Sequence, residues 1–139
     1  MPAMMQAGWR LTLEMWAWAR ILPLAIGRRD LNGIIALAQA APVPRFDGVS
    51  PQAIAERAVR LTRHPWLMRN RRCLRQGVLG YRFLRMAGHS PELHFGIERK
   101  SLAAQKVAAH CWVELQGTPV INACLEDMET VLVHKGTGQ

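Results

Sequence analysis

The chain has 139 residues, a formal net charge of +8 and a hydrophobic fraction of 50%. This length favours a single domain over residues 1–139, and the hydrophobic fraction excludes wholesale disorder. The three cysteines are odd in number and contain no CxxC pair, and we find no secretory signal pattern. We therefore expect free thiols in a reducing, cytoplasmic setting.

Residues 4–26 form a long apolar run that predicts the first helix. Charged side chains interrupt the run, which argues against a transmembrane span. Three tryptophans and flanking arginines still leave contact of this helix with a membrane surface open, beside packing on the core or on a partner protein. We expect Pro23 to end or kink this helix, and Asp30 to cap a second short helix over residues 31–40.

A linker rich in proline and glycine, residues 41–48, ends the N-terminal helical part of the chain, residues 1–48. Ser50 followed by Pro51 is a typical helix start, and the pattern predicts a helix over residues 51–61. Its apolar residues lie on one side. Its charged residues are expected to face outward: Glu56, Arg57 and Arg60.

A strong helical pattern covers residues 73–87, and Gly88 is expected to end it. Two glycines inside this pattern, Gly77 and Gly80, share a face with Cys73. Each glycine costs about 1 kcal/mol relative to alanine in a helix. We therefore expect another element to approach the helix backbone closely on the face of the cysteine.

Alternating apolar and polar residues predict three strands after this helix, with room for a fourth short one. The predicted strands are residues 92–99, 109–115, 119–123 and 131–133. Helices followed by a central helix and an antiparallel meander indicate an α+β domain, with residues 49–139 as its core.

A thiol, an imidazole and a carboxamide follow one another in the chain as Cys73, His110 and Asn122. They have the chemistry of a nucleophile, its base and the group that orients the base. At a helix N-terminus, the unpaired amides and the positive end of the dipole would stabilise a thiolate and an oxyanion. Taken singly, Cys73 and His110 are better explained by a buried structural thiol and a satisfied core histidine; only their ordered combination with a glycine-bearing helix makes the catalytic explanation equally good.

The strand register decides whether His110 and Asn122 share a face of the sheet. If Trp112 lies opposite Asn122, all three share a face, and a slip of one residue separates them. Cys111 is expected to point away from His110, and both Cys111 and Cys124 are interpreted as structural thiols. The histidines and cysteines show no standard zinc spacing, so we expect no metal and no other cofactor.

Several short segments resemble the lasso peptide biosynthesis B2 protein family, over roughly the last two thirds of the chain. They are Cys73-Leu74, Leu84-Arg85-Met86-Ala87-Gly88, Phe95-Gly96-Ile97 and Ala109-His110-Cys111-Trp112-Val113-Glu114 with Gly117. Members of this family are transglutaminase-like, papain-related cysteine peptidases that remove the leader from a lasso precursor peptide. The resemblance implies a transglutaminase-like α+β fold and the same peptidase activity.

Position by position, Cys73 matches the family's nucleophile and His110 its general base, whereas Asn122 stands where the family usually has aspartate. An amide can orient an imidazole but cannot offset the charge of an imidazolium. The departure implies reduced activity, a papain-style Cys-His-Asn site, or an acidic third member at Glu126 or Asp127.

The resemblance also implies partners: the precursor leader peptide, a separate leader-recognition (B1) protein and a lasso cyclase. The apolar N-terminal helices and the basic surface are candidate docking sites for them. Two other functions stay open, a basic binding module and a weakly active scaffold that acts through a partner. Nucleic acid is not an expected ligand, because the arginines have few aromatic neighbours for base stacking.

Overall fold

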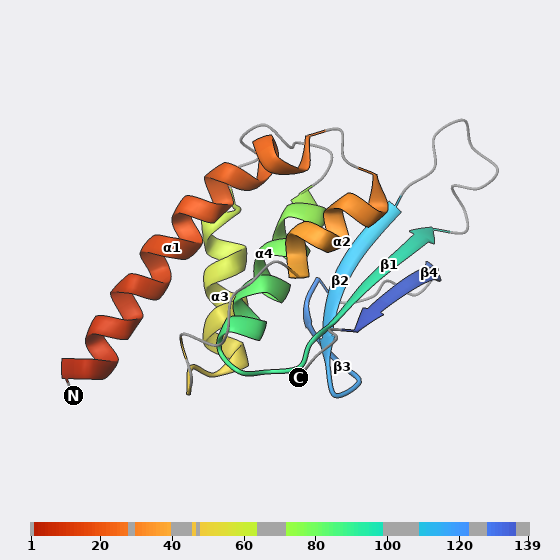
Figure 1. Ribbon diagram of the computed structural model, residues 1–139. Coiled ribbons are helices and arrows are strands. Elements are labelled where there is room, and N and C mark those ends of the chain that lie inside the picture. Colours follow the sequence, from red (N-terminus) through yellow and green to blue (C-terminus); the bar gives the residue numbers. More distant parts are fainter. Residues whose placement is uncertain are drawn as a thin grey trace.

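The computed structural model describes residues 2–27, 30–39, 46, 48–63, 72–98, 109–122 and 128–135. These residues form the helices α1 (Pro2–Ile26), α2 (Leu31–Gln39), α3 (Pro51–Leu61) and α4 (Arg72–Met86). They also form the strands β1 (Glu92–Glu98), β2 (Ala109–Leu115), β3 (Thr118–Ile121) and β4 (Met128–Lys135). The helices gather on one side of an antiparallel sheet (Figure 1), which confirms the α+β class.

The central helix α4 contacts the three other helices and the strands β1, β2 and β3. A Cβ atom added at Gly77 would lie 2.6 Å from Cys111 Sγ, and one added at Gly80 would overlap Ile121 Cδ1. The predicted close approach on the face of the glycines is therefore confirmed, and β2 and β3 make it. Gly88 ends the helical segment with φ 91°, as predicted.

The N-terminal helices form largely where the sequence predicts them. Pro23 lies in the last turn of α1, which continues to Ile26. The Asp30 carboxylate accepts a hydrogen bond from the Gly33 amide at 2.9 Å and so caps α2, as expected. None of the described helices has the length and apolar character needed to cross a bilayer.

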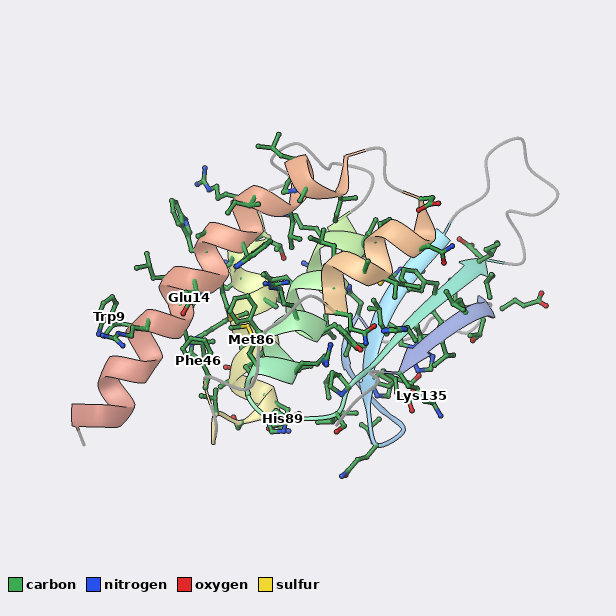
Figure 2. The ribbon with its side chains drawn as sticks, viewed as in Figure 1. Trp9, Glu14, Phe46, Met86, His89 and Lys135 are labelled. Atoms are coloured by element: carbon green, nitrogen blue, oxygen red, sulfur yellow. The ribbon has the colours of Figure 1, made fainter. Side chains whose placement is uncertain are left out.

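Part of the predicted linker is anchored to the core. The Phe46 amide donates a hydrogen bond to the Met86 carbonyl oxygen at 3.0 Å, at the end of α4 (Figure 2). The Phe46 ring is buried and lies 6.4 Å from the Phe83 ring. Phe46 is therefore fixed to α4, and one hydrophobic cluster extends from α1 to β3.

Helix α3 begins as predicted, because the Ser50 hydroxyl accepts a hydrogen bond from the Ala53 amide. The expectation that Arg57 faces outward is wrong. Its side chain is half-buried, and its guanidinium donates to Thr12 Oγ1 at 3.0 Å and to the Ala53 carbonyl oxygen at 3.2 Å. A long arginine side chain can cover a neighbouring helix while its head finds acceptors there.

Two further arginines, Arg75 and Arg82, are buried. Arg75 is 3% exposed, and its Nε donates to the Ala19 carbonyl oxygen of α1 at 2.8 Å. Arg82 donates to the Leu37 carbonyl oxygen of α2 at 3.1 Å and lies over the Trp18 ring. Helix carbonyls thus compensate part of the cost of burying these cations, and each bond fixes an N-terminal helix to α4.

The strands lie in the order β3-β2-β1-β4. Leu93, Cys111 and Ile121 belong to the core cluster that α4 covers. His94 pairs directly with Trp112 in the β1–β2 ladder and therefore lies on the opposite face. Strand β4 is longer than the predicted segment 131–133, and β3 ends earlier than predicted, because Asn122 adopts φ 54°.

Strand β4 packs against α4 through His134. Its ring centroid lies 5.7 Å from that of Tyr81, and its buried Nε2 has no hydrogen-bond partner among the described residues. Burial lowers the pKa of His134 below the ordinary value of 6.5, and the nearby Arg85 lowers it further. The imidazole is therefore favoured in its neutral form in the fold.

Replacing His134 with phenylalanine is expected to remove one source of acid sensitivity. Because the folded pKa is lowered, the unfolded chain takes up the proton first as the pH falls. The contribution of His134 to the free energy of unfolding is constant above about pH 6.5 and declines from there to the lowered folded pKa. Urea unfolding of the wild type and the variant across this pH range measures both free energies of unfolding. If the difference between the two proteins did not change with pH, the expectation would be contradicted.

Candidate active site

Cys73 is the second residue of α4 and is half-buried. Its thiol therefore lies in the first turn of the central helix, at the end where backbone amides lack helical partners. This end of a helix favours a negative charge by the dipole and by direct hydrogen bonding. The placement agrees with the sequence prediction and suits a thiolate nucleophile.

The second described thiol, Cys111, is placed quite differently. It is 1% exposed, and its Sγ lies over Gly77, one turn along α4 from Cys73. Burial raises the pKa of Cys111 well above its ordinary value, and the neighbouring Cys73 adds to this effect. Cys111 therefore stays a protonated thiol that fills space between α4 and β2. Cys124 lies outside the described residues.

The His110 imidazole stacks on the Trp112 indole, with ring centroids 6.0 Å apart and an interplanar angle of 25°. Side chains of neighbouring residues point to opposite faces of a strand. The Cys111 side chain faces α4, so the His110 side chain lies on the other face of the sheet. Its Nε2 is buried and has no hydrogen-bond partner among the described residues. A buried ring nitrogen without a partner is uncommon, and His134 Nε2 is a second example among the described residues. The described contacts contain no hydrogen bond from this ring to Cys73 or Asn122, so their pairing stays a prediction.

Asn122 joins the first turn of α4 to β2. Its Nδ2 donates to the Cys73 carbonyl oxygen at 3.1 Å and to the Cys111 carbonyl oxygen at 3.2 Å. Val113 pairs with Ile121, so Asn122 follows in the register opposite Trp112, but its φ of 54° turns the chain out of the strand. Its side chain therefore reaches α4 and not the face of Trp112, although the register is the one for which we expected the two residues to share a face. Both partners are carbonyl oxygens, which can only accept hydrogen bonds, so the NH₂ group of the Asn122 amide must point toward them.

Replacing Asn122 with aspartate is expected to destabilise the fold by about 2 kcal/mol, because both donated hydrogen bonds are lost. The carboxylate would also face two carbonyl oxygens. Glycine at this position tolerates positive φ and serves as the uncharged control that lacks the same two bonds. Urea unfolding of the three proteins separates the loss of the two hydrogen bonds from the effect of the added carboxylate charge. A variant Asn122→Asp as stable as wild type would show that these bonds contribute little.

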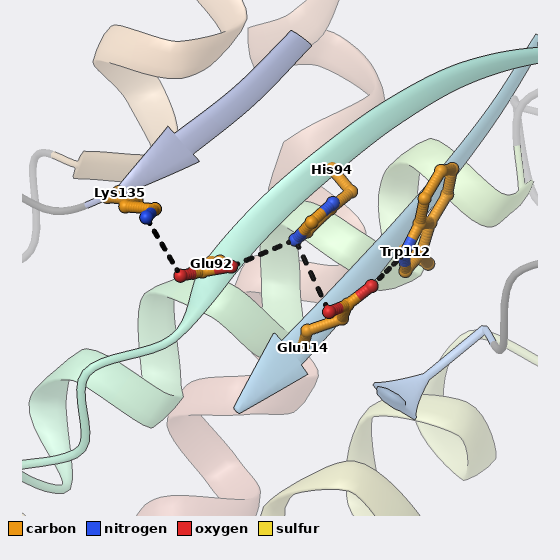
Figure 3. A network of polar contacts seen from close by, with 5 residues as sticks. All are labelled: Glu92, His94, Trp112, Glu114 and Lys135. Carbon is orange, nitrogen blue, oxygen red and sulfur yellow. Dashed lines mark hydrogen bonds and ion pairs between the residues drawn. The ribbon is translucent and has the colours of Figure 1, made fainter. Parts of the chain in front are cut away.

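A polar network lies on the face of the sheet opposite α4 (Figure 3). The Trp112 Nε1 donates to Glu114 Oε2 at 2.8 Å, and His94 Nε2 lies 3.1 Å from Glu92 Oε1 and 3.7 Å from Glu114 Oε1. Lys135 Nζ lies 3.5 Å from Glu92 Oε2. With His94 stacked on Trp112 at 5.3 Å, the network holds the indole against which His110 packs.

The same network contains the described group whose donors could hold a metal ion. Donor atoms of Glu92, His94 and Glu114 lie within 4.8 Å of one another. The Lys135 ammonium and the Trp112 N–H engage the outer carboxylate oxygens, so one oxygen of each carboxylate already has a partner within the protein. Sequence reasoning missed this network, although the alternate spacing of Glu92 and His94 on one strand was a usable signal.

The predicted alternative acidic groups, Glu126 and Asp127, lie outside the described residues.

A half-buried thiol lies in the first turn of a central helix, beside a sheet that carries an imidazole whose Nε2 has no hydrogen-bond partner among the described residues. These features define a candidate thiol-nucleophile protein. The sequence matches the family described as the transglutaminase-like superfamily over residues 9–133. This match covers most of the chain, which therefore belongs to that superfamily. No match was found among curated proteins or among solved structures.

Proposed function

We propose that this chain is a cysteine peptidase with Cys73 as nucleophile and His110 as general base. The superfamily includes cysteine peptidases. The observation that carries the proposal is the contrast between the described thiols. Cys73 is partly accessible at the positive end of α4, whereas Cys111 is buried and its pKa is raised. The unpartnered Nε2 of His110 supplies a ring nitrogen that is not engaged in the fold.

The His110 ring packs on Trp112, on the face of the sheet away from α4, so this mechanism requires the ring to turn toward the first turn of α4. There the Cys73 thiol transfers its proton to His110, and the thiolate attacks the scissile carbonyl carbon. Amides of the first turn of α4 stabilise the oxyanion of the tetrahedral intermediate. The imidazolium then protonates the leaving amine, and water hydrolyses the thioester to return the thiol. Asn122 holds the Cys73 peptide unit against β2 and so fixes the nucleophile, a role distinct from orienting the base.

The substrate we propose is the leader segment of a lasso precursor peptide, by resemblance to the B2 family around Cys73 and around His110 to Glu114. The proposed partners follow from the same resemblance: a separate leader-recognition (B1) protein that delivers the precursor, and a cyclase that acts on the released core peptide. The N-terminal helices and the exposed arginines are the surfaces we propose for these contacts.

The direct test combines the chain, its recognition protein and the precursor peptide, with the products identified by mass spectrometry. Iodoacetamide should label Cys73 ahead of Cys111, because alkylation needs an accessible thiolate. The rate of precursor cleavage should fall in proportion to the fraction of Cys73 that is alkylated. Peptide mapping of the labelled chain also follows Cys124. Undiminished cleavage by chain that is fully alkylated at Cys73 would remove the proposal.

A second candidate function is a weakly active scaffold that acts through its partner. It is favoured by one observation, that the described hydrogen bonds of Asn122 go to two main-chain carbonyls and none reaches His110. A scaffold predicts that precursor and recognition protein bind normally while Cys73 reacts with iodoacetamide no faster than a thiol in an unfolded peptide. The peptidase predicts a faster reaction with a pH dependence that His110→Ala alters.

A further inference from the structure

Helix α1 is apolar on two opposite sides. Its inner side buries Leu11, Met15, Leu22 and Ile26 in the core. Its outer side carries large apolar residues that are strongly exposed: Trp9 at 56%, Leu13 at 53%, Trp16 at 46% and Leu24 at 73%. We call these four the outer stripe; the Trp9 side chain projects away from the other helices (Figure 2). A helix that is apolar all round is normally covered on all sides, so the outer stripe marks an interaction surface.

The outer stripe borders a groove between α1 and α3. The groove has a volume of about 620 Å³, and Trp9, Leu13, Trp16 and Leu61 supply its apolar walls. The Arg57 guanidinium contributes to the lining and is fixed there by its bonds to Thr12 and Ala53. A concave apolar surface with one fixed cation suits an inserted side chain or helix better than a flat bilayer surface.

Cations accompany the apolar residues along the stripe. The Arg10 guanidinium lies 5.8 Å from the centroid of the Trp9 ring, and that of Arg20 lies 5.1 Å from the centroid of the Trp16 ring. With Arg57 in the groove, three arginines surround the two exposed indoles. The chain as a whole carries a net charge of +8. Carboxylates on a partner would complement this surface, whereas a second copy of the chain would place arginines against arginines.

We propose that the outer stripe and its groove bind an amphipathic helix of a partner polypeptide, with apolar residues on one side and acidic residues along both flanks. From Trp9 to Leu24 the stripe is about 22 Å long at 1.5 Å per residue, which matches a partner helix of about four turns. Exposed tryptophans with stacked arginines are the residue types that dominate binding at such interfaces. The proposal holds whether or not the chain is a peptidase.

The test uses two labelled synthetic peptides of about 16 residues with the same leucine face, one flanked by glutamate and one by lysine, and follows binding to the full chain by fluorescence anisotropy. We expect the glutamate peptide to bind at least tenfold more tightly. Leu13→Ala with Trp16→Ala should weaken it at least tenfold. Arg10→Glu with Arg20→Glu should reverse the preference. Val131→Ala, which truncates an equally exposed apolar residue on β4, should leave binding unchanged.

Other results would overturn the proposal. Binding of neither peptide, equal binding of both, or loss of binding by Val131→Ala alone would show that the stripe does not select an acidic helix. Binding to phosphatidylglycerol vesicles that Leu13→Ala with Trp16→Ala abolishes, without peptide binding, would make the stripe a membrane surface. Sedimentation as a dimer that the same variant dissociates would make it a contact between copies. Circular dichroism of each variant confirms that it is folded.

Discussion

Replacing Cys73 with alanine is expected to reduce the proposed leader cleavage by at least about a thousandfold, because no other described thiol can replace it. Cys111 is buried and its pKa is raised, and its sulfur lies over Gly77 on the inner face of α4. Thermal unfolding should change little, since the bond that joins this position to Asn122 uses the Cys73 carbonyl oxygen, which alanine retains. Single-turnover cleavage of the precursor measures the loss.

The matched control is Cys111→Ala, which removes a sulfur from the core and leaves the proposed nucleophile in place. It should retain cleavage and lose about 1 kcal/mol of stability from the small cavity. His110→Ala should resemble Cys73→Ala in cleavage while the protein stays folded. If Cys73→Ala cleaved normally and Cys111→Ala did not, the nucleophile would have been assigned to the wrong thiol.

Gly80→Ala is expected to destabilise the fold by about 1–3 kcal/mol, although alanine is the better helix former. The added Cβ would overlap Ile121 Cδ1, and that side chain is 2% exposed in the core. Ile121→Val removes the same Cδ1 atom at a cost of about 0.5–1.5 kcal/mol. The double variant should therefore be more stable than the sum of the two single changes indicates. Urea unfolding of all four proteins gives this coupling.

Gly8→Ala provides the comparison within a helix where space is available. The nearest atom to an added Cβ there is Arg57 Nη2, at 3.9 Å. This variant should be stabilised by up to about 1 kcal/mol through helix propensity alone. If Gly8→Ala and Gly80→Ala changed stability alike, packing against β3 would not be the reason for the glycine in α4.

The helix boundaries could be predicted because local chemistry determines them. Ser50, Asp30 and Gly88 each cap or end a helix through bonds within a few residues, and alternation gave the strands. The two glycines of α4 correctly indicated a close neighbour. The burial of Arg75 could not be predicted, because its acceptor on Ala19 lies 56 residues away and leaves no local pattern.

The candidate site was predicted in part. The position of Cys73 in the first turn of a helix follows from the local pattern around it. The environment of Asn122 does not, because one left-handed residue after β3 redirects its amide to α4. The support of Trp112 by Glu114 and His94 depends on the pairing of two strands, which a single sequence leaves unspecified. Register and single-residue dihedral angles were therefore the information that the sequence lacked.

The hydrogen bonds from buried arginines to the N-terminal helices bear on how the protein can be divided. A shortened chain of residues 49–139 would retain Cys73, His110 and Asn122, and by sequence it looks like a self-sufficient catalytic half. In that fragment, however, Arg75 and Arg82 would lose their acceptors on Ala19 and Leu37. Both guanidinium groups would face water, and the apolar surface of α4 that α1 and α2 cover would be exposed. Such a fragment should aggregate when expressed alone, and adding residues 1–48 as a separate peptide should rescue it.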